Sequence, residues 1–375
     1  MLENSFKFQI LNYWRNIDKK ILLSFLLLFF LGLFFSFSST SSLAGERLNK
    51  DYYFFFSKHL SFAILSLLIM IFISAIDTLL LNKLVIPLFI FSFIFLALVP
   101  IMGIEVKGAK RWLDLYFFRL QPIEILKPFF ILMTVKILTF EKLQNSQVKY
   151  FFSFLLLSSV IILLVDQPDL GQSILLIGSW IFTVFISGVS IFYIAGFFTI
   201  FLIALTSLLF LLPTKFGYII NRLATFFNPD QGDKFQSSIA LDAIKLGGFT
   251  GQGMGEGILK ERVPEAHTDY VIAIISEEYG SLVSVMIISI FLYISFRIIK
   301  NCFNQDDHFI KVSLCGLSTL LIFQTFIHAG VNTNLIPTTG MTLPFLSYGG
   351  SSLIGSAILA GVILNYTKNK VHLYD

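Results

Sequence analysis

Apolar runs fill most of this chain, and each is about as long as the hydrocarbon core of a membrane is thick. A helix needs about 20 mostly apolar residues to cross that core. We expect a transmembrane helix in each of the following segments: residues 21–40, 59–76, 84–102, 121–140, 150–166, 170–189, 191–212, 271–298, 309–330 and 349–366. The expected fold is therefore an all-α integral membrane protein with about ten transmembrane helices.

The composition agrees with a membrane protein and excludes several other classes. Hydrophobic residues make up 56% of the chain and charged residues 13%, whereas soluble domains carry about 25% charged residues. The net charge of +4 includes no basic block that would indicate a nucleic-acid partner. The sequence also lacks the phosphate-binding loop of ATPases, the HExxH motif of zinc proteases and the GxSxG motif of serine hydrolases.

We expect residues 1–375 to form a single transmembrane domain. The basic segment 1–20 favours a cytoplasmic N-terminus, and ten spans return the C-terminus to the same side. Residues 6–14 have the pattern of a short helix lying at the membrane interface. The first apolar segment is longer than the core of a signal peptide, so we expect it to be retained.

Two loops between the expected spans differ from the rest. Residues 103–120 are basic although this topology places them outside, so either the topology is inverted or the cations bind an anionic substrate. Residues 213–270 form a long extracytoplasmic loop between the seventh and eighth spans, and unstructured loops of that length are usually functional. The glycine-rich residues 247–257 within it are either a flexible connector or a nest of backbone N–H groups that binds an anion.

A charged cluster marks the start of the fourth expected span. Pro122 suits the first turn of a helix, and Glu124 and Lys127 then lie three residues apart on one face. Ionisable groups at that depth are costly and usually functional. The alternative is a self-neutralising pair that only holds helices together. Arg111 and Arg119 add positive charge of the kind that binds phosphate.

Asp269 lies at the mouth of the eighth expected span. The helix dipole favours a carboxylate there, so the position by itself indicates a helix-terminal charge more than a catalytic group. Glu277 is eight residues further on, about 12 Å along a helix, which is too far for both carboxylates to bind one atom. We therefore expect a structural or supporting role for Glu277.

Residues 332–352 contain no charged side chain but many hydroxyl groups, two prolines and three glycines. Such a segment is typical of a bent or re-entrant backbone that lines a polar cavity. His328 lies just before it, and a single histidine at the end of a span is more often structural than catalytic.

Five segments of the sequence resemble signature segments of the SEDS family, named for shape, elongation, division and sporulation. In chain order they are GAKRWLDL with RLQPIEILKP, DQPDLGQS, GGFTGQGMGEG, PEAHTDYVIAIISEEYG and GMTLPFLSYGGSS. The resemblance covers nearly the whole chain, and five motifs in order make it specific. The GMGEG and GMTLPFLSYGG segments look more like the division branch of the family than the elongation branch.

Members of this family are ten-span peptidoglycan glycosyltransferases of the bacterial inner membrane. The resemblance implies that the chain polymerises lipid II, the undecaprenyl-pyrophosphate-linked disaccharide peptide, at the outer face of that membrane and at the division septum. It also implies that a class B penicillin-binding transpeptidase and other division proteins are partners, beside membrane lipid and without nucleic acid.

The family's functional residues match positions of this sequence. Asp269 matches an essential loop aspartate, and Glu261 matches an acidic position of the division branch. Ile123 stands where the family usually has serine, so that hydroxyl group is missing here. We expect substrate-binding roles for Arg111, Arg119, Glu124, Lys127, Glu261, His267 and Ser347.

The expected mechanism joins one sugar to another. A sugar hydroxyl is a poor nucleophile at neutral pH, so a general base helps, and Asp269 is the candidate. The pyrophosphate leaving group needs charge neutralisation more than protonation. Arg111, Arg119 and Lys127 supply it, alone or with a divalent cation such as magnesium or manganese; no metal-ligating residues are predicted. Direct displacement converts an α-linked donor into a β-1,4 linkage.

Three other functions fit the same sequence. A lipid II flippase or transporter also has many spans and charges facing the bundle interior, but it needs no base at the outer surface. An elongation polymerase of the same family has the same chemistry. A scaffold for division proteins would tolerate substitution of Asp269, Lys127 and Arg119 together.

Overall fold

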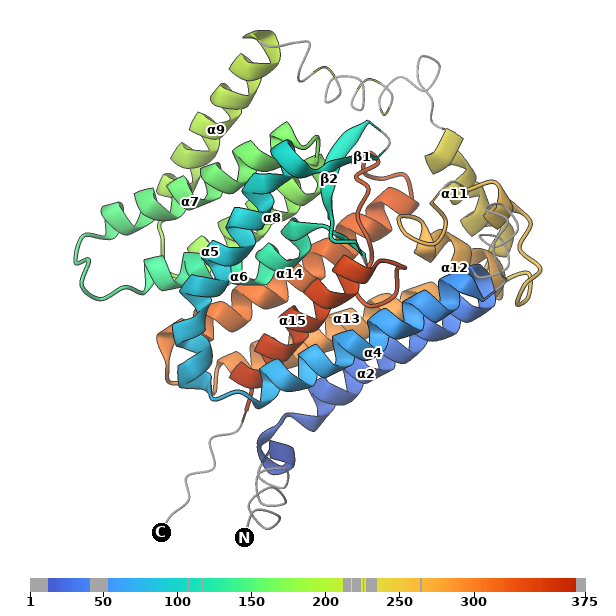
Figure 1. Ribbon diagram of the computed structural model, residues 1–375, viewed down its shortest axis with the longest axis horizontal. Coiled ribbons are helices and arrows are strands. Elements are labelled where there is room, and N and C mark those ends of the chain that lie inside the picture. Colours follow the sequence, from blue (N-terminus) through green and yellow to red (C-terminus); the bar gives the residue numbers. More distant parts are fainter. Residues whose placement is uncertain are drawn as a thin grey trace.

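The computed structural model describes residues 13–40, 53–106, 108–116, 118–211, 235–263 and 265–368, together with residues 217, 224 and 226. Within these residues the chain forms a helical bundle with a small sheet at one end (Figure 1). The interfacial helix expected over residues 6–14 lies mostly outside the described residues.

A helix occupies each of the ten segments expected to span the membrane. Six of the described helices are long and apolar enough to cross it, and others, such as α8 and α15, have 17 residues and are shorter. The helices are α2 (Lys19–Phe35), continued by the π-helical turn Ser36–Thr40, then α4 (Phe54–Ala75), α5 (Thr78–Met102), α6 (Pro122–Leu138), α7 (Ser146–Asp166), α8 (Leu170–Ile186), α9 (Ile191–Leu211), α12 (Val271–Tyr279), α13 (Ser281–Cys302), α14 (His308–Asn332) and α15 (Gly350–Tyr366).

Polar caps begin many of these helices where the apolar runs begin. The side chains of Asp18, Asp77, Asn145, Asp169 and Asp307 accept hydrogen bonds from backbone N–H groups in the first turns of α2, α5, α7, α8 and α14. A cap of this kind satisfies N–H groups that have no partner within the helix. The sequence therefore carries both the apolar length of these helices and the signal that starts them.

The eighth expected span is not one helix. It is broken at Gly280 into α12 and α13, because Gly280 has a φ of +89° and a Cβ there would collide with the backbone of Phe249 and Thr250. Only glycine adopts this backbone at little cost. The break lets the glycine-rich loop pack directly against the end of α12.

The basic loop at residues 103–120 contains a three-stranded antiparallel sheet, which was not predicted. The strands are β1 (Ile104–Val106), β2 (Ala109–Asp114) and β3 (Arg119–Leu120). Val106 pairs with Ala109 across a tight turn that contains Gly108 at a φ of +76°. The sheet gives the two arginines of this loop fixed positions at one end of the bundle.

Most of the second half of the long loop before α12 belongs to the described residues. It contains the helix α11 (Phe235–Gly247), which was not expected, and the short 3-10 turn Leu259–Glu261. The N–H groups of Gln252 and Gly253 donate to the carbonyl oxygens of Glu277 and Glu278 at 2.9 and 3.0 Å. The glycine-rich segment is therefore clamped onto α12, and these two N–H groups are not available to an anion.

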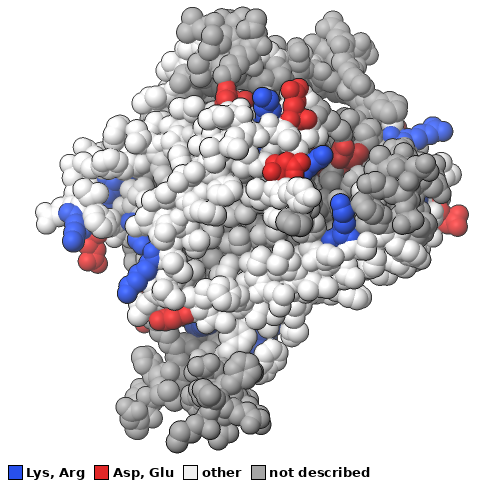
Figure 2. Space-filling view, in the orientation of Figure 1, with Lys and Arg blue, Asp and Glu red and all other residues white. Residues whose placement is uncertain are grey.

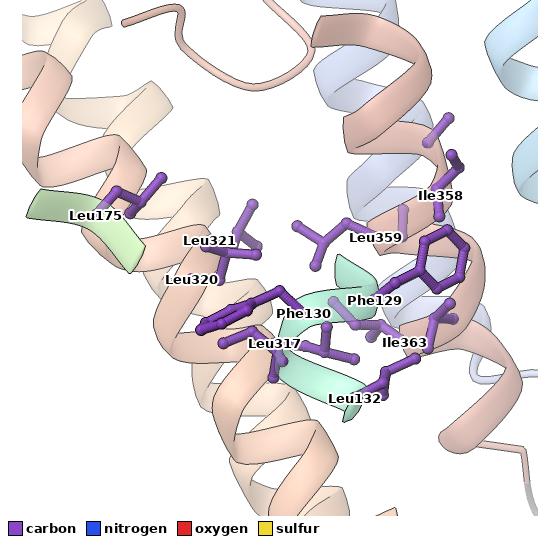
Figure 3. Packing of buried hydrophobic residues seen from close by; sticks show 14 of the residues in the cluster. Phe129, Phe130, Leu132, Leu175, Leu317, Leu320, Leu321, Ile358, Leu359 and Ile363 are labelled. Atoms are coloured by element: carbon purple, nitrogen blue, oxygen red, sulfur yellow. The ribbon is translucent and has the colours of Figure 1, made fainter. Parts of the chain in front are cut away.

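The hydrophobic core centres on α6, which lies between α14 and α15 (Figure 3). Phe129 and Phe130 point from α6 toward these two neighbours. Glycines permit close packing: a Cβ at Gly361 of α15 would lie 3.0 Å from the Met70 carbonyl oxygen of α4. Small residues at contacts are typical of helix packing in membranes.

The surface has the charge distribution of a membrane protein. Figure 2 shows a broad uncharged surface over the middle of the bundle, with lysine, arginine, aspartate and glutamate gathered toward its two ends. Large apolar side chains such as Phe72, Leu79 and Phe91 are exposed on the outside of the bundle. Since exposed apolar area of this extent is rare in soluble monomers, these side chains face lipid.

Candidate active site

A cavity of about 500 Å³ opens at the end of the bundle that carries the sheet. Its walls come from β2, β3, the turn before α12, and the bent segment between α14 and α15. We call it the candidate cavity. The polar side chains that line it include Arg111, Arg119, Gln121, Glu265, His267, Thr268, Asp269, Thr342, Tyr348, Ser351 and Ser352.

Asp269 lies in a tight turn immediately before α12. Its N–H donates to the Glu265 carbonyl oxygen at 3.0 Å, and its own carbonyl oxygen accepts from the Asn332 side chain at 3.0 Å. Asn332 is fully buried, and its Oδ1 accepts from the Ala273 N–H at 2.9 Å. Asn332 therefore ties the end of α14 to both sides of this turn. It is the residue of this site that sequence reasoning did not single out.

Arg111 and Asp269 both approach one point of the cavity. A Cβ built on Gly340 would lie 3.5 Å from Nη1 of Arg111 and 3.7 Å from Oδ2 of Asp269. Gly340 has a φ of +71°, a backbone conformation that favours glycine. Because Gly340 has no Cβ, the space next to the Arg111 guanidinium group and the Asp269 carboxylate stays open.

Arg111 is held on β2 by the loop between α7 and α8. Its Nε donates to the Gln167 carbonyl oxygen at 3.2 Å, and its Nη2 donates to the carbonyl oxygen of Pro168. Two carbonyl acceptors orient the guanidinium group, and the buried carboxyl group of Asp169 lies near enough to interact with its charge. Arginine stays protonated in proteins, and its planar fork suits the oxygens of an anionic ligand.

Arg119 lies at the rim of the cavity on β3, and its side chain is exposed. Its carbonyl oxygen accepts from Ser351 Oγ at 2.9 Å, and the same hydroxyl group accepts from the Gln121 N–H at 3.0 Å. Ser351 at the start of α15 therefore fixes the backbone of β3.

His267 and Ser347 have different positions. The ring of His267 lines the cavity and contacts Tyr348, with the ring centres 5.7 Å apart. Ser347 is buried and does not line the cavity; its Oγ donates to the Thr268 carbonyl oxygen at 2.6 Å and accepts from the Leu343 N–H at 2.8 Å. The hydroxyl group of Ser347 holds the bent segment against the turn that carries Asp269.

The bent segment also contains strained backbone. Phe345 has a φ of +66°, which is unusual for a bulky residue. Its ring is buried against Phe25 and Phe29 of α2, with ring centres 5.4 and 5.0 Å apart. Burial of this ring offsets the backbone strain and fixes the segment on the bundle.

Glu124 and Lys127 lie below the cavity and do not line it. Glu124 Oε2 and Lys127 Nζ form an ion pair at 2.8 Å, and both side chains are buried. Gln172 donates to Glu124 Oε1 at 2.7 Å, and Lys127 donates to Gln324 Oε1 at 3.0 Å. These four residues are the buried network. Its geometry matches the alternative of a self-neutralising pair.

Two further bonds join the buried network to the cavity walls. Gln324 Nε2 donates to the carbonyl oxygen of Thr342 at 3.0 Å. The Asp169 carboxylate accepts from Gln121 Nε2 at 3.2 Å and from the Gln172 N–H at 3.4 Å. Burial raises the pKa of Asp169, and the nearby Arg111 opposes that rise. Hydrogen bonds therefore connect the network to Thr342 and, through Asp169, to Gln121, both of which line the cavity.

Glu277 has the structural role expected for it. Its carboxylate accepts from the N–H groups of Leu259 and Lys260 at 2.6 and 2.8 Å. Next to it, Lys260 Nζ and Glu278 Oε1 form a buried ion pair at 2.6 Å. The side chain of Glu261 lies outside the described part of the structure.

No cluster of three or more histidine, cysteine, aspartate or glutamate side chains that suits a metal ion occurs among the described residues. Two carboxylates, Glu265 and Asp269, line the cavity. Magnesium is commonly bound by one or two carboxylates together with substrate phosphates and water. The residues present therefore fit an ion that arrives with a phosphorylated ligand, rather than one held by protein alone.

Comparison with solved structures supports the fold. The chain aligns with a protein from a study titled "Structural coordination of polymerization and crosslinking by a peptidoglycan synthase complex", with a TM-score of 0.77 and 24% identity over 94% of this chain and 97% of the other. The rod shape determining protein RodA of Thermus thermophilus aligns with a TM-score of 0.68 and 24% identity over the same shares. At this identity the likeness concerns the fold.

Comparison of sequences identifies the family as well as the fold. The chain is 33% identical over 363 residues to a probable peptidoglycan glycosyltransferase FtsW of Caulobacter vibrioides, covering 96% of this chain and 92% of the relative. It is 32% identical over 360 residues to stage V sporulation protein E of Bacillus subtilis, covering 94% and 97%. The family model described as cell cycle protein, which unites FtsW, RodA and SpoVE, matches residues 18–372. This multi-pass membrane protein belongs to the FtsW/RodA/SpoVE family.

Proposed function

We propose that this chain is a peptidoglycan glycosyltransferase that polymerises lipid II, with Asp269 as the general base. The observation that carries the proposal is the placement of Asp269 and Arg111 around the open side of Gly340 in the candidate cavity. The relatives named peptidoglycan glycosyltransferase support it, since they align over nearly the whole chain.

The reaction joins two lipid-linked saccharides. The 4-hydroxyl group of one sugar attacks the anomeric carbon of the other, and its proton passes to Asp269. The bond from the anomeric carbon to the pyrophosphate oxygen breaks, and the lipid pyrophosphate leaves with the electron pair. Attack from the opposite face inverts an α-linked donor to a β-1,4 linkage. A positioned base of this kind contributes roughly 100-fold to 10,000-fold to a rate.

The cations of the cavity match the leaving group. Arg111 has neutral partners at two of its nitrogens and lies across Gly340 from Asp269. Arg119 adds exposed charge at the rim, where the lipid-linked pyrophosphate approaches from the membrane. Guanidinium groups bind phosphate oxygens in a bidentate manner and stabilise the charge that develops on them. A bound divalent cation would supply further neutralisation there.

A lipid II flippase is the rival function. It would use charges deep in the bundle, whereas the deep charges Glu124 and Lys127 are paired with each other and capped by Gln172 and Gln324. The exposed site at the bundle end holds the carboxylate that a polymerase needs. This contrast favours polymerisation over transport.

The test is polymerisation of labelled lipid II by the purified protein, together with its cognate class B transpeptidase, beside Asp269→Asn. We expect long glycan from the unchanged chain and a loss of at least ~100-fold from the variant. Asp114→Asn is the matched control. Asp114 is an exposed carboxylate at the end of β2, the strand that carries Arg111, and it does not line the cavity. Normal polymerisation by a folded Asp269→Asn protein would remove Asp269 as the base.

We place the activity in septal wall synthesis, with the termini in the cytoplasm and a class B transpeptidase as partner. Support comes from relatives named FtsW and from the solved complex that couples polymerisation to crosslinking. Depletion in the source cell separates the two branches: filaments are expected for a division enzyme, and rounded cells would indicate an elongation enzyme.

A further inference from the structure

The end of the bundle opposite the candidate cavity has an apolar groove that contains one lysine side chain. Helices α5, α6 and α7 pack against one another there and leave a groove of about 450 Å³. Its walls are almost entirely apolar, with Ile86, Met133, Leu155 and Leu156 among them. Among the described residues, Lys136 in the last turn of α6 is the single charged residue that lines it. We call it the lysine groove.

Lys136 differs from two other cations of the bundle that have carboxylate partners. Lys127 pairs with Glu124, and Arg297 pairs with Asp18. Lys136 forms no ion pair within 4.0 Å among the described residues; its Nζ donates to the carbonyl oxygen of Asn82 at 2.6 Å. The α6 dipole favours a cation at that end but supplies only about half a charge. A partly buried ammonium group in lipid-facing surroundings therefore lacks a full counter-charge.

The lysine groove continues into a polar hollow. A neighbouring hollow of about 370 Å³ shares Lys136 and Phe140 with the groove and is also lined by Lys142, Glu141 and Asp307. Apolar walls thus lead to a polar position with two ammonium and two carboxylate groups, where the last turn of α6 meets the loop. α6 begins at the candidate cavity with Pro122, and Lys136 is 14 residues further along it, so this position is roughly 21 Å away from that cavity.

From this arrangement we propose that the lysine groove binds a membrane glycerophospholipid, with its phosphate on Lys136 and an acyl chain along α7. The lipid belongs to the leaflet opposite the candidate cavity, so the site is separate from that of the polymerised substrate. The apolar length of the groove suits a hydrocarbon chain, and the phosphate supplies the charge that Lys136 lacks. Basic pockets between helices near a membrane surface bind lipid head groups in this way.

Native mass spectrometry of the full-length protein in detergent tests the phosphate contact. The probes are dioleoyl phosphatidylglycerol and dioleoylglycerol, which carry the same chains with and without a phosphate. We expect the phospholipid to bind more tightly, and Lys136→Met to weaken its binding by roughly tenfold. Lys83→Met is the matched control, because Lys83 is exposed, lies beside Asn82 and lines neither hollow. Equal binding of the two probes, or equal loss in both variants, overturns the proposal.

A second pair of variants tests whether the acyl chain of the lipid lies in the groove. Leu155→Trp fills the groove while Lys136 stays in place, and we expect it to weaken phospholipid binding several-fold. Ile162→Trp puts the same ring on the same helix seven residues away, outside the groove, and should leave binding unchanged. Undiminished binding in the Leu155→Trp protein would show that the groove does not hold the lipid, whatever Lys136→Met does.

Discussion

The candidate cavity and the buried network contain the same kinds of group but arrange them in opposite ways. In the cavity, Arg111 and Asp269 approach a common point that is left open by Gly340. In the network, Glu124 and Lys127 form an ion pair with two glutamines as further partners. Charged groups that border an open space can contact a substrate. Charge that is cancelled within the protein instead fixes the helices, and here it fixes the walls of the cavity.

The largest effect on stability is expected when the Glu124–Lys127 ion pair of the buried network is broken. Lys127→Met leaves the Glu124 carboxylate buried without its counter-charge, which costs about 3–5 kcal/mol of unfolding free energy. Lys245→Met is the matched control, because Lys245 forms a pair with Asp242 at the same three-residue spacing, but the pair is exposed. That change should cost under ~1 kcal/mol. Denaturant unfolding in detergent measures both, and equal losses would mean that burial does not distinguish the two pairs.

The double variant Glu124→Gln with Lys127→Met sharpens this result. Removing both charges takes away the unpaired buried carboxylate, so most of the lost stability should return. Its polymerisation rate then separates two roles. Normal activity at restored stability would assign the pair to packing, whereas a folded but inactive protein would show that the charges act on the reaction.

The next effect concerns the open side of the cavity. Gly340→Ala puts a methyl group between Arg111 and Asp269, and we expect the polymerisation rate to fall about 10-fold to 100-fold because the reacting groups are displaced. Gly188→Ala is the control: Gly188 also has a positive φ, +95°, but a Cβ there meets nothing within 4 Å. Both variants carry a similar backbone strain of roughly 1–2 kcal/mol. Equal polymerisation rates in the two variants would show that the reacting sugars do not occupy the space beside Gly340.

The smallest effect is expected at the rim. Arg119→Ala should change the unfolding free energy by less than about 0.5 kcal/mol, because the side chain is exposed. We expect its KM for lipid II to rise a few-fold at low salt and to approach the unchanged value at high salt, since exposed charge is screened. Arg119→Lys keeps the charge, so its KM should stay close to that of the unchanged protein. Steady-state kinetics at two ionic strengths provide the measurement, and a KM that rises equally at both would exclude an electrostatic role.

Reasoning from the sequence failed where contacts between distant segments decide the structure. One apolar run, residues 271–298, predicted one helix, yet the glycine-rich loop packs onto it and breaks it at Gly280. The same loop looked like a connector or an anion nest because its partners, the carbonyl groups of Glu277 and Glu278, lie outside its own motif. Ser347 was expected to contact substrate, but its hydroxyl group bonds to Thr268 and Leu343.

The sequence by itself determined that this chain is a membrane protein and where most of its helices lie, because apolar length and capping residues act locally. The resemblance of its motifs to a known family marked Asp269 as a candidate, and the charge of the two arginines marked them as candidates for binding phosphate. Only the tertiary structure decided which of those charges meet. Arg111, Gly340 and Asp269 come from three separate segments, and Lys127 finds Glu124 within its own helix but Gln324 on another. Whether a charge is cancelled or available depends on neighbours that helix packing supplies, and that packing is not written in any local pattern.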